Sequence, residues 1–92
     1  MRVIRSGHCY KVENFENKSE SQEIQFIEKE QIEPGSTELV TVYDGTTTEE
    51  LLKVLINRMQ YLQGKLPCRE NAIVITKLEE SLMWLDKKNA DR

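Results

Sequence analysis

The chain takes on a helical pattern at residues 46–66, which read TTTEELLKVLINRMQYLQGKL. Thr47 and Glu50 match a capping box, in which a hydroxyl and a carboxylate satisfy the free amides at a helix start. Apolar residues then recur at spacings of three and four, the pattern of a coiled-coil-like seam, and they are Leu52, Leu55, Met59, Leu62 and Leu66. Gly64 and Pro67 are predicted to end or interrupt this helix.

A second helix is predicted to begin between Pro67 and Asn71. Its seam repeats the spacing of the first and consists of Ile75, Leu78, Leu82 and Leu85. Because only a short loop around residues 64–69 joins the two helices, we expect their seams to pair in an antiparallel helical hairpin.

The residues before Gly45 show the period of two that is typical of β-strands. Candidate strands cover residues 9–12, 22–28 and 37–43, with a polar connector at 16–21 and a turn signal at 34–36. Three short strands predict one small antiparallel sheet, which needs a helix or another subunit to cover it. We therefore expect an α+β fold and a single domain at 1–92, with a β-rich segment at 1–45 and a helical hairpin at 46–92.

The composition limits the class of protein. Of 92 residues, 38% are hydrophobic and 32% are charged, so one chain has little apolar surface to bury, and we expect it to form an oligomer. No apolar run reaches the roughly 18 residues of a membrane span. No apolar segment follows the basic N-terminal residues, so we expect no secretory signal.

The net charge of −3 argues against ordinary DNA or RNA binding, which needs a basic face. The charge is uneven along the chain. Residues 1–45 hold five basic and nine acidic side chains, whereas residues 46–92 hold eight basic and seven acidic ones. We expect any anion site to be local and to lie in the second half.

The search for catalytic and metal-binding patterns is almost empty. Cys9 and Cys68 lie far apart, and His8 is the one histidine, so we expect two free thiols in a reducing compartment and no metal site. His8 and Cys9 are neighbours on a predicted strand and would point to opposite faces, which argues against a catalytic pair. No phosphate-binding, dinucleotide-binding or hydrolase motif is present. The sequence predicts a protein that binds without catalysis.

Five polar or aromatic residues lie off the predicted seams, and each has two interpretations. Tyr61 either packs on its neighbours or stacks on a nucleobase, and Trp84 either packs in the hairpin or between subunits or touches a ligand. Asn71 either caps the second helix or presents its amide to an adenine edge. Lys88 and Arg92 either oppose the helix dipole or clamp a pyrophosphate from one face.

Four stretches of the second half resemble the helical hairpin domain of phage immune-evasion sponges. They are residues 44–52 (DGTTTEELL), 55–62 (LINRMQYL), 67–72 (PCRENA) and 75–85 (ITKLEESLMWL). Two families share this hairpin, the anti-Thoeris sponges of the first type and the anti-CBASS sponges. Residues 7–10 (GHCY), 14–15 (NF) and 25–29 (QFIEK) in a β-rich segment favour the anti-Thoeris family, because the anti-CBASS sponges are helical throughout.

The resemblance implies that the protein sequesters glycocyclic ADP-ribose messengers in the cytoplasm of an infected bacterial host, without cleaving them and without a cofactor. It implies that Tyr61 stacks on the base, that Asn71 contacts it, and that Lys88 and Arg92 hold the phosphates. Lys88 stands where the family usually has an arginine, and a lysine cannot make the bidentate fork to a phosphate. Some relatives also bind cyclic di- or trinucleotides as hexamers built from three dimers, and the candidate residues for that site are Arg69 and Thr76.

The separation of the candidate residues adds an inference of its own. Asn71 and Lys88 lie seventeen positions apart on one predicted helix, which corresponds to about 26 Å. If both touch one messenger, they come from different subunits, and a symmetric dimer then carries two composite pockets. The alternative functions are a cyclic-oligonucleotide sponge of CBASS immunity, a protein–protein adaptor that docks through the hairpin and Trp84, and an enzyme that degrades the messenger.

Overall fold

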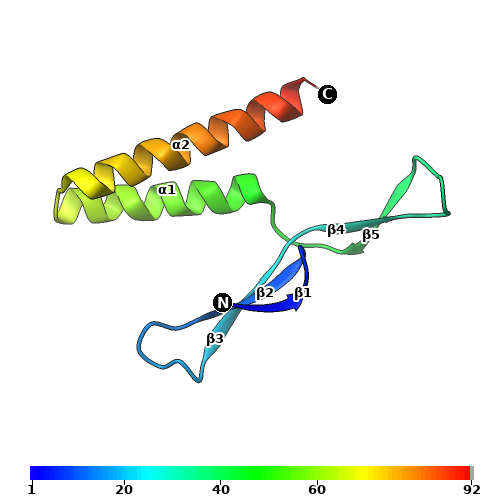
Figure 1. Cartoon of the computed structure of the whole chain (residues 1–92), viewed down its shortest axis with the longest axis horizontal. Helices are drawn as coiled ribbons and strands as arrows, with labels where there is room; N and C mark the ends of the chain where they lie inside the picture. The colour runs from blue at the N-terminus through cyan, green and yellow to red at the C-terminus, as the bar shows by residue number, and fades with distance from the viewer. Residues whose placement is uncertain (92) are drawn as a thin grey trace. The chain divides into compact units, whose positions relative to one another are not determined.

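The computed structural model describes residues 1–91 and divides into two compact units. Met1–Thr47 form a unit of five β-strands, and a unit of two helices begins at Thr48. Figure 1 shows the order of these elements along the chain. The α+β class with strands first and a helical hairpin second is as predicted. That both units make a single domain stays a prediction.

The strands form two antiparallel sheets, so the prediction of one three-stranded sheet was wrong. Strands β1 (Arg2–Arg5), β2 (Cys9–Glu13) and β3 (Ser21–Gln25) form the first sheet in the order β1-β2-β3. Strands β4 (Glu28–Gln31) and β5 (Leu39–Tyr43) form the second. Strand β1 was missed, because the few residues before the first predicted strand do not alternate.

The predicted strand at residues 22–28 is divided in two because its middle residues bond outside both ladders. The amide of Phe26 donates to the carbonyl of His8 at 2.7 Å, and the amide of Ile27 donates to the carbonyl of Thr46 at 2.9 Å. The amide of Thr46 in turn donates to the carbonyl of Gln25 at 2.8 Å. These bonds carry the chain from the first sheet to the second.

Gly45 makes this crossing possible because of the space it leaves. A Cβ at this position would lie 2.7 Å from the carbonyl carbon of Gln25 and 2.8 Å from that of Phe26. Both neighbours are backbone atoms that cannot move aside without breaking the bonds of Thr46. Any larger residue therefore disturbs the crossing.

Side chains reinforce the contact between the two sheets. The guanidinium of Arg5 on β1 donates to the side chain of Gln25 at 2.7 Å and lies 4.0 Å from the ring centroid of Tyr43 on β5. The carboxylate of Glu28, which is only 12% exposed, lies 3.7 Å from Arg5 Nε and 3.6 Å from His8 Nε2. Charged and aromatic side chains thus connect the two sheets of this unit.

Helices α1 (Thr48–Lys65) and α2 (Arg69–Ala90) form the predicted hairpin and run antiparallel (Figure 1). The seam of α2 is confirmed, since its half-buried apolar residues are Ile75, Leu78, Leu82 and Leu85. The seam of α1 is shifted, because Ile56 is half-buried whereas Leu55 and Leu66 are exposed at 47% and 78%. Leu66 was wrongly placed because the helix ends one residue before it, and Gly64 lies within the helix.

A side chain closes the turn between the helices. The amide group of Gln63 donates to the carbonyl of Cys68 and accepts from its amide, both at 3.0 Å. The thiol sulfur of Cys68 then accepts from the amide of Asn71 at 3.4 Å, which makes Cys68 the N-cap of α2. Two bonds from one side chain therefore fix the conformation at the start of α2.

Very little of this chain is buried. Among the described residues, Cys9 is the one buried apolar side chain, and neither helix contains a buried residue. Large apolar side chains that are more than half exposed include Val54 and Tyr61 on α1 and Met83 and Trp84 on α2. This exposed surface agrees with the expectation of an oligomer, which itself stays a prediction. Neither described helix is apolar enough over a sufficient length to cross a membrane.

Two glycine-to-alanine substitutions test this description of the fold. Gly45→Ala is expected to lower the free energy of unfolding by about 2 kcal/mol or more, because the new Cβ clashes with backbone. Gly64→Ala is the matched control, since no atom lies within 4 Å of its Cβ position, and it should be neutral or stabilise α1 by up to about 1 kcal/mol. Urea unfolding followed by circular dichroism at one protein concentration measures both. Equal effects would contradict the close approach at Gly45.

Candidate functional site

The candidate residues Tyr61 and Asn71 lie at the same end of the hairpin. Tyr61 belongs to the last turns of α1, and Asn71 to the first turn of α2, on either side of the closed turn. The ring of Tyr61 is 59% exposed, and Lys65 Nζ lies 5.5 Å from its centroid. Packing within the hairpin therefore leaves much of this ring exposed, and a nucleobase has room to stack on it.

Asn71 is held in place by its backbone rather than by its side chain. Its amide N–H bonds to Cys68, so the interpretation of Asn71 as the helix cap was wrong, and Cys68 has that role. The residue is half-buried, and its side-chain amide makes no hydrogen bond to the residues the structure describes. An amide with a fixed backbone and a free side chain can match the donor and acceptor of an adenine edge.

Lys88 lies at the other end of the hairpin, in the last turn of α2. It is exposed and forms no ion pair within residues 1–91, whereas its neighbour Lys87 lies 3.7 Å from Asp91. Arg92, the second predicted phosphate ligand, lies outside the described residues. Because α2 is continuous from Arg69 to Ala90, Asn71 and Lys88 of one chain are separated by about 26 Å.

Arg69 and Thr76, the two candidates for a second ligand, come together on one face of α2. They line a shallow depression of about 300 Å³ with Ala72, Ile73 and Lys77. The hydroxyl of Thr76 donates to the carbonyl of Ala72 at 3.1 Å, and its lone pairs stay free to accept. Arg69 supplies a cation that suits an anionic ligand, whereas Lys77 pairs with Glu80 at 3.9 Å.

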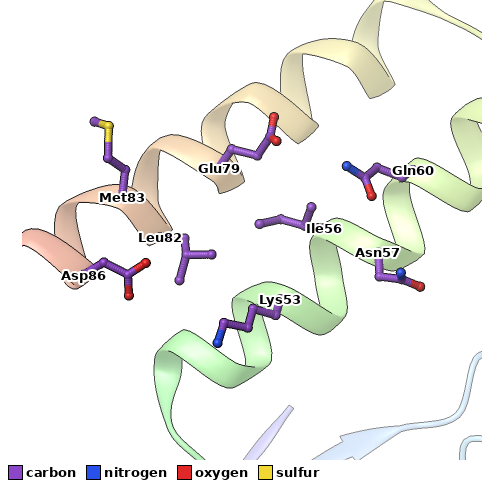
Figure 2. Close-up of a pocket in the computed structure, with 8 residues that line it drawn as sticks. All are labelled: Lys53, Ile56, Asn57, Gln60, Glu79, Leu82, Met83 and Asp86. Atoms are coloured by element: carbon purple, nitrogen blue, oxygen red, sulfur yellow. The ribbon is translucent and has the colours of Figure 1, made fainter.

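A larger groove between the two helices was not predicted from the sequence. It has a volume of about 520 Å³ and is shown in Figure 2, with Ile56 and Leu82 directed between the helices. Polar side chains from both helices surround this apolar base, and they are Lys53, Asn57, Gln60, Glu79 and Asp86. Their positions beside each seam, one turn apart on α1 and two turns apart on α2, were the signal in the sequence. Trp84, which is 57% exposed, is not packed inside the hairpin, so that part of its interpretation was wrong.

The described residues hold no cluster of three metal-ligating side chains. His8 and Cys9 have separate partners, because His8 Nε2 lies beside Glu28 whereas the Cys9 thiol donates to Glu23 at 3.2 Å. Burial raises the pKa of the Cys9 thiol, and the hydrogen bond to Glu23 and its negative charge raise the pKa further. Cys9 is therefore a buried, protonated thiol without the thiolate character of a nucleophile.

Comparison with known proteins finds a family match that covers both helices and most of strands β3 to β5. The family model described as "Acb2/Tad1, hairpin domain" matches residues 22–90, which is more than half of the chain. The chain is also similar to Thoeris anti-defense 1 of Bacillus phage SBSphiJ7, with 52% identity over 50 residues, or 53% of this chain. The aligned part covers 35% of that relative, so the chain spans about a third of its length.

The two cysteines are expected to differ sharply in reactivity. Both are free, but Cys68 is exposed at a helix N-terminus and Cys9 is 1% exposed. Labelling of the native protein with a thiol reagent at pH 8 should modify Cys68 at least about a hundredfold faster than Cys9. Cys68→Ser is the control, because serine also caps helices and leaves only the slow thiol. Fast labelling of that variant would contradict the burial of Cys9.

Proposed function

The chain belongs to the Acb2/Tad1 hairpin-domain family, and from this membership we propose that it is a phage immune-evasion sponge for glycocyclic ADP-ribose. It binds the messenger and holds it without cleaving it, so that the effector of the Thoeris defence is not activated. The similarity to a phage protein named Thoeris anti-defense 1 supports this choice within the family. The site of action is the cytoplasm of the infected host.

One observation carries the proposal: within residues 1–91, groups suited to a nucleotide stay exposed or without a hydrogen-bonding or ion-pair partner at the two ends of the hairpin. Tyr61 offers an exposed ring and Asn71 a free amide at the turn, and Lys88 offers a free cation at the end of α2. In the proposed complex Tyr61 stacks on the adenine, Asn71 bonds to its edge, and Lys88 and Arg92 hold the pyrophosphate.

The pocket is composite in this proposal. About 26 Å of helix separates Asn71 from Lys88, which is farther than one cyclic ADP-ribose molecule spans. The two residues therefore act on one messenger only when they come from different chains, and a two-fold dimer has two such pockets. Lys88 contributes a point charge where a bidentate arginine is usual, so we expect phosphate contacts that are less directional.

A cyclic di- or trinucleotide is the second candidate ligand. The observation that favours it is the depression on α2 where Arg69 and Thr76 meet beside Lys77. The residues of this site differ from those of the proposed messenger pocket. In the proposal, the site binds its ligand in a hexamer made of three dimers. A protein–protein adaptor function would instead use the groove between the helices and Trp84.

Retention of the messenger tests the main proposal. The protein is incubated with glycocyclic ADP-ribose, freed of unbound ligand and then denatured, and the released material is analysed by chromatography. We expect intact messenger, with a large loss of retention in Tyr61→Ala, because stacking contributes about 1–3 kcal/mol per base. Degraded messenger would show an enzyme. No retention would reject the proposal, and the same assay with cyclic dinucleotides then tests the second candidate.

Mixing two inactive variants tests the composite pocket. Asn71→Ala and Lys88→Ala should each abolish tight binding, because every pocket of either homodimer lacks one ligand. In an equal mixture that exchanges subunits, each heterodimer has one intact pocket, so about a quarter of the wild-type capacity should return. A mixture of Asn71→Ala and Lys87→Ala is the control. Lys87 pairs with Asp91, so the Lys87→Ala variant should bind the messenger normally on its own. Failure of the first mixture to regain capacity would count against a shared site.

A further inference from the structure

A basic pocket lies in the first sheet of the first unit, and none of its residues has been discussed so far as a ligand contact. It has a volume of about 110 Å³ and is lined by Arg2, Lys11, Lys18, Glu13, Ser19 and Ser21. Residues 1–45 hold five basic side chains against nine acidic ones, and three of the five meet at this pocket. In an acidic half of the chain, such a concentration of positive charge marks the pocket as an anion site.

The strand register places two of these cations side by side. Arg2 on β1 and Lys11 on β2 are directly opposite each other. Like charges at opposite positions of an antiparallel pair repel and destabilise the sheet. Within residues 1–91 neither side chain forms an ion pair within 4.0 Å, and the carboxylate of Glu23 opposite Lys11 offsets only part of the repulsion. A bound anion between them would remove it.

Two carboxylates lie near the cations of the pocket, one within its lining and one beside it. Glu13 lies 3.9 Å from Lys18 Nζ and pairs with that cation. Glu23 on β3 is opposite Lys11, but its carboxylate accepts the hydrogen bond of the Cys9 thiol at 3.2 Å. The three cations and one carboxylate of the lining therefore leave an excess of two positive charges.

Hydroxyl groups complete the lining. Ser21 begins β3 directly opposite Glu13 and makes no side-chain hydrogen bond to the described residues. Ser19 lies in the turn between β2 and β3, where its hydroxyl and its amide both bond to Asn17. The free hydroxyl of Ser21 can donate to an oxyanion bound beside the neighbouring cations. Hydrogen bonds to a charged acceptor are stronger than those between neutral groups.

The volume limits the ligand. Since one water takes roughly 30 Å³ in the liquid, the pocket holds about three or four waters, which is the scale of one tetrahedral oxyanion. We propose that the basic pocket binds a single phosphate group, either as inorganic phosphate or as the phosphate of a monoester. The nucleoside of a monoester would lie outside the pocket. This site is independent of the messenger pocket and belongs to the other unit.

Titration of the full chain with inorganic phosphate, followed by amide chemical shifts at constant ionic strength, tests the proposal. We expect saturable shifts centred on Lys11, Ser19 and Ser21, with a Kd in roughly the millimolar range for exposed cations. Adenosine monophosphate and adenosine are parallel arms. Binding of the monoester more tightly than phosphate identifies a nucleotide ligand, equal binding identifies the free anion, and adenosine should not bind. Shifts that do not saturate, or that chloride reproduces, would overturn the site.

Two lysine variants of the same unit supply the matched comparison. Lys11→Gln should weaken phosphate binding about fivefold, whereas Lys29→Gln, on exposed β4 and outside the pocket, should leave it unchanged. If Lys11→Gln does not fold, Arg2→Gln at the sheet edge replaces it. Equal weakening by the pocket variant and by Lys29→Gln would refute the assignment.

Discussion

The unbroken length of α2 is the constraint on which the proposed mechanism depends. A hydrogen-bonded helix from Arg69 to Ala90 cannot fold back, so the groups at its two ends keep a fixed separation. The clamp of Gln63 on Cys68 fixes one of these ends and, with it, the position of Asn71. In the proposed mechanism, function therefore depends on the distance between these groups, which a partner chain would bridge.

Periodicity and turn chemistry predicted the parts of the fold that depend on local sequence. The α2 seam was predicted from the spacing of apolar residues, and the helix starts were predicted from capping and helix-breaking residues. The shift from Leu55 to Ile56 in α1 was not predictable, because both are apolar neighbours and the choice depends on how the helices cross. The two-sheet arrangement depends on bonds from Phe26, Ile27 and Thr46 that join distant segments, and no local pattern reports such bonds.

Only part of the candidate site could be predicted from the sequence. Residue types that suit a nucleotide were visible as Tyr61, Asn71 and Lys88, and the structure adds that their side chains are exposed or unpartnered. The capping role of Cys68 was not visible, since cysteine is outside the usual set of capping residues. The basic pocket was also missed, because the acidic sum of residues 1–45 conceals three cations that only strand pairing brings together.

The scarcity of buried side chains has a consequence for how a ligand shared between two chains would behave. Cys9 is the one fully buried apolar residue among those described, so in the proposed dimer contacts between chains would supply much of the buried apolar surface. A messenger gripped from both sides then acts as a cross-link. By reciprocal linkage, dimerisation raises affinity for the messenger, and the messenger tightens the dimer by the same factor. Release of the messenger would require the two chains to separate at the pocket. The occupied state would therefore be long-lived, which suits a protein proposed to act by sequestration.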